Sequence, residues 1–168
     1  TLYVKGQGEF NEGLAMLVGL TGARLFLERE YGPSHALSTR AEEAMQDERL
    51  FSTFVGALAE RLERLYNSPV PYEEKLRERE KVFAVAMEEF DRLRARLKTD
   101  RYRPFGNAGM NNAYLLSLAL YHRNYLLMES YLRSRGSSIP EMITALRRIA
   151  EGGGDTLEKM RWESPQKE

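Results

Sequence analysis

Apolar side chains recur every seven residues along two stretches of the chain, and this spacing limits the fold more than any other feature. In residues 34–66 the repeating positions are Leu37, Ala44, Phe51, Leu58 and Leu65. In residues 72–98 they are Leu76, Phe83, Phe90 and Leu97. Such a spacing places side chains on one face of an α-helix. Because residues 67–71 break the pattern with Pro69 and Pro71, the two helices are predicted to form an antiparallel hairpin.

The remaining sequence predicts further helices, at about residues 10–31, 111–133, 138–150 and 155–162. Gly32-Pro33 is a strong stop for the first of them, Ser34 can cap the helix that follows, and Ser138 opens a capping box. Trp162 and Met160 are expected to dock on the bundle. We therefore predict an all-α helical bundle with a long antiparallel hairpin and a short extended N-terminal lead-in. Residues 1–163 are predicted to form a single domain, and residues 164–168 a disordered tail.

The charge balance and the residue types exclude several classes of function. Lys plus Arg and Asp plus Glu number 25 each, and there is no cysteine. The chain therefore has no net positive charge that would attract nucleic acid or an anionic membrane. Without cysteine, disulfides and thiolate metal sites are ruled out. The basic residues between Arg92 and Arg103 alternate around a helix instead of forming one stripe, so no nucleic-acid role is expected. No apolar run is long enough to span a membrane.

Glu12 is the acid whose position is hardest to explain as a surface charge. It shares a helical face with small or apolar residues, namely Ala15, Met16, Gly19, Ala23 and Phe26. A carboxylate there needs a cation, a metal or hydrogen-bond donors to offset its desolvation. The simpler alternative is that Asn11 caps the helix and Glu12 is a first-turn acid favoured by the helix dipole. The small residues every four positions are expected to serve tight packing.

Two blocks of the sequence resemble the predicted zinc aminopeptidase family. The first consists of residues 1–6, Phe10-Asn11-Glu12-Gly13-Leu14-Ala15, Gly22-Ala23 and Phe26-Leu27, and the second of Asn111-Asn112-Ala113, Leu115 and Tyr121. In that family a zinc-binding HExxH helix precedes an Asn-Glu-x-x-Ala helix, whose Glu is taken as the third metal ligand. The resemblance therefore implies that Glu12 is a zinc ligand. It also implies that this chain is the part C-terminal to the HExxH.

The HExxH motif itself does not occur in this sequence, whose only histidines are His35 and His122. Catalytic zinc takes three protein ligands, and the HExxH glutamate supplies the general base. We therefore expect zinc in the parent protein, none bound to this chain alone, and no activity of this chain alone. The chain begins with Thr, which suggests a processed product or a fragment.

Four polar residues near the second block are further candidates for the site. His122 lies on an apolar helical face, where it is either a hydrogen-bonded core residue or a proton donor or substrate contact beside the metal. Tyr121 is either a core aromatic residue or a hydroxyl that stabilises an oxyanion. Asn111 and Asn112 either cap a helix or bind a peptide terminus.

Two functions from different classes follow. In the first, the chain is the C-terminal helical part of a zinc-dependent aminopeptidase, in which it supplies the third zinc ligand and a wall of the cleft that binds the peptide substrate. In the second, it is a non-catalytic interaction or oligomerisation module. Because residues 113–121 are apolar on nearly every side, some self-association into a homo-oligomer is expected. The sequence leaves the compartment open.

Overall fold

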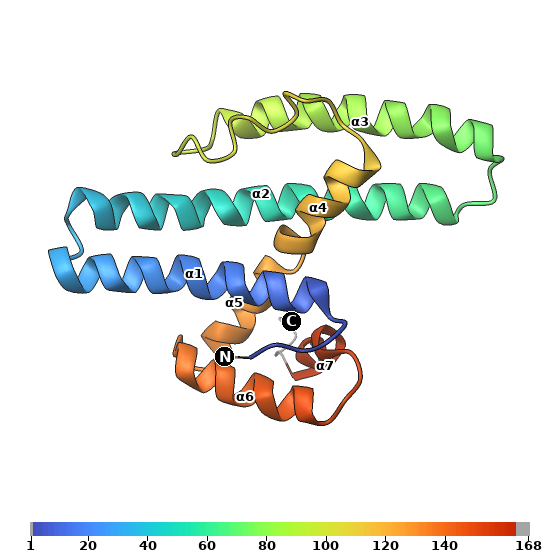
Figure 1. The fold of residues 1–168 in the computed structure, drawn as a ribbon. Coiled ribbons are helices and arrows are strands. Elements are labelled where there is room, and N and C mark those ends of the chain that lie inside the picture. Colours follow the sequence, from blue (N-terminus) through green and yellow to red (C-terminus); the bar gives the residue numbers. More distant parts are fainter. Residues whose placement is uncertain (1, 164–168) are drawn as a thin grey trace.

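The computed structural model describes residues 2–163, and within them it is all-α, as predicted (Figure 1). The helices are α1 (Gly8–Tyr31), α2 (Ala36–Asn67), α3 (Tyr72–Arg94), α4 (Asn112–His122), α5 (Tyr125–Ser134), α6 (Ile139–Glu151) and α7 (Thr156–Glu163). Residues 2–5 form the expected lead-in outside the helices. The tail predicted at residues 164–168 lies outside the described residues.

The three longest helices lie side by side with α2 in the middle, and α4 crosses α2 and reaches α1 (Figure 1). The predicted hairpin between α2 and α3 is confirmed, and α1 packs against the other side of α2. His35, rather than Ser34, caps α2: its Nδ1 accepts the backbone N–H of Leu37 at 3.2 Å. Within residues 2–163 no helix is long and apolar enough to cross a membrane.

One hydrophobic cluster lies between α2, α3, α4 and the loop of residues 95–111. The central members of both seven-residue repeats are buried in it, namely Phe51, Leu58, Phe83 and Phe90. The loop adds Tyr102, whose ring stacks on Phe51 at a centroid distance of 4.0 Å. The repeat in the sequence therefore marks the side of the hairpin that α4 and the loop cover.

A second hydrophobic cluster lies between α1, α5, α6 and α7. Its fully buried members are Phe10, Leu17, Tyr125, Met128, Tyr131, Met142, Leu146 and Met160. The prediction that Met160 and Trp162 both dock on the bundle is half right. Met160 is buried, but Trp162 is 79% exposed, because it lies on the side of α7 that faces away from this cluster.

The chain bends between α4 and α5, where the sequence predicted one continuous helix to about residue 133. The bend lies at Arg123 and Asn124. It allows α4 to pack in the first cluster and α5 in the second. Asn124 is buried at the bend, where its Nδ2 donates to Glu9 Oε2 at 2.9 Å and its Oδ1 accepts from Arg161 at 3.2 Å. These contacts offset the loss of regular helix.

Helix α3 ends earlier than the predicted residue 98 because Asp47 binds the backbone that follows it. The side chain of Asp47 is fully buried and accepts the N–H groups of Lys98 at 2.9 Å and Thr99 at 2.7 Å. It also accepts the Thr99 hydroxyl at 2.6 Å. These donors therefore need no helical partner, and the chain can turn towards α4.

Candidate functional site

Helix α1 presents Glu12 on the side that faces away from the second cluster. The buried side of α1 consists of Phe10, Gly13, Leu14, Leu17 and Thr21. On the opposite side Ala15, Gly19, Ala23 and Phe26 are exposed, and Phe26 is 58% exposed. We call these four residues the open face of α1. A Cβ added at Gly19 would meet nothing within 4 Å.

The expectation that these small residues serve tight packing is wrong within the described chain. The helices that contact α1 use its other side, because that side carries the large apolar residues. Glu12 is half-buried at the edge of the open face. Among residues 2–163 no hydrogen-bond or ion-pair partner approaches its carboxylate. The open face therefore combines apolar surface with an unpaired acid.

Asn11 holds the lead-in against α1 and does not cap the helix, so the alternative based on an Asn11 cap is wrong. The backbone N–H of Val4 donates to Asn11 Oδ1 at 2.9 Å, and Asn11 Nδ2 donates to the Val4 carbonyl at 2.7 Å. The side-chain amide of Asn11 thus hydrogen-bonds both backbone polar groups of Val4, as a neighbouring peptide group would. The N-cap position belongs to Gln7, and α1 begins earlier than predicted.

No cluster of three or more potential metal ligands occurs among the described residues. His35 caps α2 and stacks on Tyr31, at the opposite end of α1 from Glu12. His122 is engaged with another acid, Glu48. Among the described residues, Glu12 could therefore provide one of the ligands of a metal ion, but it does not form a set of three with its neighbours. The two histidines that a catalytic zinc would need are not present beside it.

A buried polar network surrounds Glu48, which the sequence did not single out. Its carboxylate is fully buried. Oε1 lies 2.6 Å from His122 Nδ1 and accepts the Ser52 hydroxyl at 2.7 Å, while Oε2 accepts the Tyr102 hydroxyl. The network thereby connects α2, α4 and the loop between α3 and α4.

Hydrogen bonding determines the charge state of this network. Burial by itself raises the pKa of Glu48, but the hydrogen bond and charge of His122, with the Tyr102 and Ser52 hydroxyls, outweigh it and hold the pKa below its usual value. Burial, and then the charge of Glu48, raise the pKa of Tyr102. Glu48 is therefore an ionised acceptor and Tyr102 a neutral donor. His122 lies in the core with a hydrogen bond, which agrees with the first of its two predicted roles.

A groove with a volume of about 620 Å³ lies between α2, α4 and the first turn of α1. It is lined by Glu9, Ala59, Leu62, Glu63, Tyr66, Asn112, Leu115, Leu116, Ser117, Ala119, Leu120 and Arg123. Of the four polar candidates near the second block, Asn112 lines this groove, and its Oδ1 accepts the Tyr66 hydroxyl at 2.8 Å. Asn111 caps α4 by accepting the N–H of Tyr114, also at 2.8 Å. Tyr121 is 39% exposed and does not line the groove.

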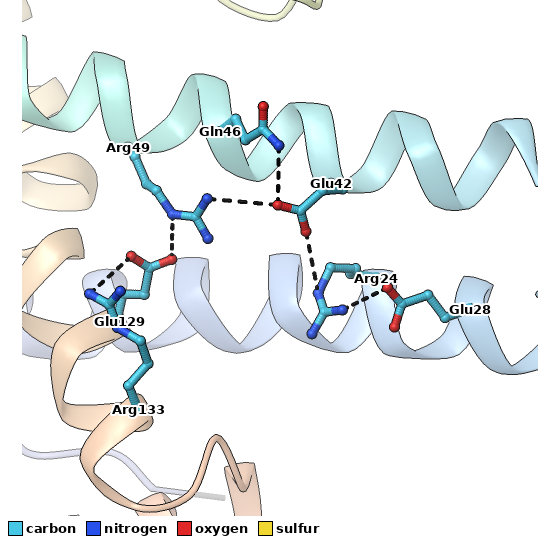
Figure 2. A network of polar contacts seen from close by, with 7 residues as sticks. All are labelled: Arg24, Glu28, Glu42, Gln46, Arg49, Glu129 and Arg133. Atoms are coloured by element: carbon cyan, nitrogen blue, oxygen red, sulfur yellow. Dashed lines mark hydrogen bonds and ion pairs between the residues drawn. The ribbon is translucent and has the colours of Figure 1, made fainter. Parts of the chain in front are cut away.

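A second polar network joins α1, α2 and α5 and serves the packing of these helices (Figure 2). Glu129 is buried and accepts from Arg49 Nε at 2.7 Å. Glu42 lies between Arg49 and Arg24, at 3.7 and 3.8 Å. Because each acid drawn in Figure 2 has an arginine partner, none of these carboxylates is free to bind an added cation.

The sequence model of one protein family, described as "Putative aminopeptidase", matches residues 1–159. The match therefore covers α1 to α6 and the first half of α7. A search of curated proteins and a search of solved structures found no match.

Proposed function

Because this chain belongs to the putative aminopeptidase family, we propose that it forms the C-terminal part of a zinc-dependent peptidase and supplies Glu12 as the third zinc ligand. One observation carries the proposal. The Glu12 carboxylate lies at the edge of the open face of α1 and has no partner among residues 2–163. A half-buried carboxylate without donors is suited to bind a cation.

The open face can accept the helix that carries the missing ligands. In an HExxH helix the two histidines lie one turn apart on the same side. Small residues at Ala15, Gly19 and Ala23 let a neighbouring backbone come close to α1. A helix packed there would bring both imidazoles towards the turn of α1 that contains Glu12. Zinc bound by this set would supply a Lewis acid and an activated water.

The chain's own residues hold Glu12 in place for this role. Phe10 and Leu14, on either side of Glu12 in sequence, are buried in the second cluster. Asn11 fixes the lead-in through its two hydrogen bonds to Val4. The turn that carries Glu12 is thus anchored from the opposite face of the helix. A ligand held by packed neighbours keeps its geometry when metal is absent.

Zinc binding by the longer protein that includes the HExxH segment tests the proposal. Loss of a residue that only hydrogen-bonds a metal ligand weakens metal affinity roughly 10–100-fold. We expect Glu12→Gln, which removes a direct ligand, to weaken zinc affinity by more than this. Competition with a chelator of known affinity measures it. Glu9→Gln, one turn earlier on α1, is the control and should keep the zinc affinity of the unchanged protein. Equal zinc affinity in Glu12→Gln and the unchanged protein would remove Glu12 from the ligand set.

The open face also favours a second candidate function, as an interaction or oligomerisation module. Phe26 is 58% exposed on α1, and Leu116 is 70% exposed on α4. If this chain acts without further segments, exposed apolar surface of this kind favours self-association. Light scattering across micromolar concentrations should then show a rising mean mass, and Phe26→Ser should reduce it. A constant monomer mass throughout would count against this function.

A further inference from the structure

The groove between α2 and α4 is apolar along most of its length. Leu62 and Leu115 form part of its buried wall, and Ala119 is also buried there. Leu116 and Leu120 line it as well. A volume of about 620 Å³ lies in the range of ligand pockets, roughly 300–1,000 Å³. The groove is thus large enough for a bulky apolar side chain together with the backbone atoms that carry it.

The charged groups of the groove leave one negative charge in excess. Among its lining residues the charged ones are Glu9, Glu63 and Arg123. Arg123 is paired with Glu63 through both terminal nitrogens, and the Nη2–Oε2 distance is 2.7 Å. The Glu9 carboxylate accepts from Asn124 through Oε2 alone. Among residues 2–163 its Oε1 has no hydrogen-bond partner. An ammonium group would complement this oxygen.

Glu9 lies one helical turn from Glu12. Residues three apart on a helix are neighbours, with Cβ atoms about 5–6 Å apart. The charged end of the groove is therefore next to the proposed zinc ligand. A group bound at Glu9 would be close to a bond cleaved at the metal, and the apolar wall of the groove extends from there along α4.

We propose that this groove binds the first residue of a peptide, with the free α-ammonium group at Glu9 and a large apolar side chain between α2 and α4. The assignment rests on the proposed peptidase function and adds its preferred substrate, a peptide with an unblocked, bulky apolar N-terminal residue. Glu9 is a positioning residue for the substrate amine. The apolar wall selects the side chain, because polar or very small side chains gain little from that surface.

Binding of small probes to the metal-free chain tests this assignment separately from zinc binding. The probes are phenylalanine amide, N-acetylphenylalanine amide and glycine amide, titrated while the backbone amide signals of α2 and α4 are followed by NMR. We expect phenylalanine amide to shift signals around the groove. The acetylated and glycine probes should bind at least tenfold more weakly, because one lacks the ammonium group and the other lacks the side chain.

Matched variants assign the two parts of the site. Glu9→Gln should weaken binding of phenylalanine amide about tenfold and leave the acetylated probe unaffected. Leu116→Asn should weaken phenylalanine amide severalfold, whereas Leu37→Asn, at an exposed leucine outside the groove, should not. Glu12→Gln should bind phenylalanine amide with unchanged affinity in the absence of metal. The groove assignment can therefore fail while Glu12 remains a zinc ligand, and Glu12 can fail as a zinc ligand while the groove assignment holds. Equal affinity for the acetylated and free probes would overturn the proposal, as would shifts that report a second copy of the chain in the groove.

Discussion

Replacing Glu48 with alanine is expected to lower the free energy of unfolding by about 3–5 kcal/mol, because three buried polar groups lose their acceptor and each such loss costs about 1–3 kcal/mol. The substitution would leave His122, Tyr102 and Ser52 without their shared acceptor in a region closed to water. Each buried group that loses its hydrogen bond adds to the loss. For a chain of this size the midpoint of thermal unfolding should fall by about 10 °C.

In the unchanged protein, the free energy of unfolding should fall at acid pH because Glu48 becomes protonated. The folded-state pKa of Glu48 lies below its usual value. Its contribution to stability is therefore fully present above the unfolded-state pKa of about 4.3, and it is lost as the pH falls through the lower folded-state pKa. Urea unfolding measured between pH 3 and 6 should show a shallower acid loss in Glu48→Gln than in the unchanged protein. Glu60→Ala, at an exposed acid of α2, is the control and should change stability by less than about 0.5 kcal/mol.

Replacing Phe10 with alanine is expected to cost about 3–5 kcal/mol, the usual cost of truncating a fully buried phenylalanine. Phe10 is 0% exposed in the second cluster and lies in the first turns of α1. Phe26→Ala on the same helix is the matched control, since Phe26 is 58% exposed, and it should change stability by less than about 0.5 kcal/mol. Urea unfolding curves of the two variants measure the difference.

The Phe10 substitution should also loosen the turn that carries Glu12. Hydrogen exchange of the amides in residues 8–14 should speed up more in Phe10→Ala than exchange in α3, which packs in the other cluster. Equal costs for Phe10→Ala and Phe26→Ala would contradict the structure. They would mean that Phe10 and Phe26 do not differ in burial.

Most helices could be predicted from the sequence because their stripes, proline breaks and capping residues are local signals. The seven-residue repeat predicted α2 and α3, and Ser138 predicted the start of α6, where it accepts the N–H of Glu141. The bend at Arg123 and Asn124 could not be predicted in this way. Neither residue is a helix breaker, and the bend depends on contacts with Glu9 and Arg161 from distant parts of the chain.

The candidate site was predictable only in part. The Asn-Glu-x-x-Ala pattern identified Glu12, but the four-residue spacing of small residues could not say whether the covering element belongs to this chain. Glu48 was missed because α2 contains many acids. The available signal was its position three residues before Phe51, on the buried side of the repeat. The groove was missed as well, because α2 and α4 meet through residues far apart in the sequence.

Gly19 and Gly22 make α1 a weaker helix than its length suggests. A methyl group at either position would meet nothing within 4 Å, while glycine inside a helix costs about 0.5–1 kcal/mol relative to alanine. The described chain thus forgoes roughly 1–2 kcal/mol of helix propensity with no internal contact in return. If the helix proposed to carry the missing zinc ligands packs against these glycines, it would restore that rigidity, and its docking and the stiffening of the helix that carries Glu12 would be one event.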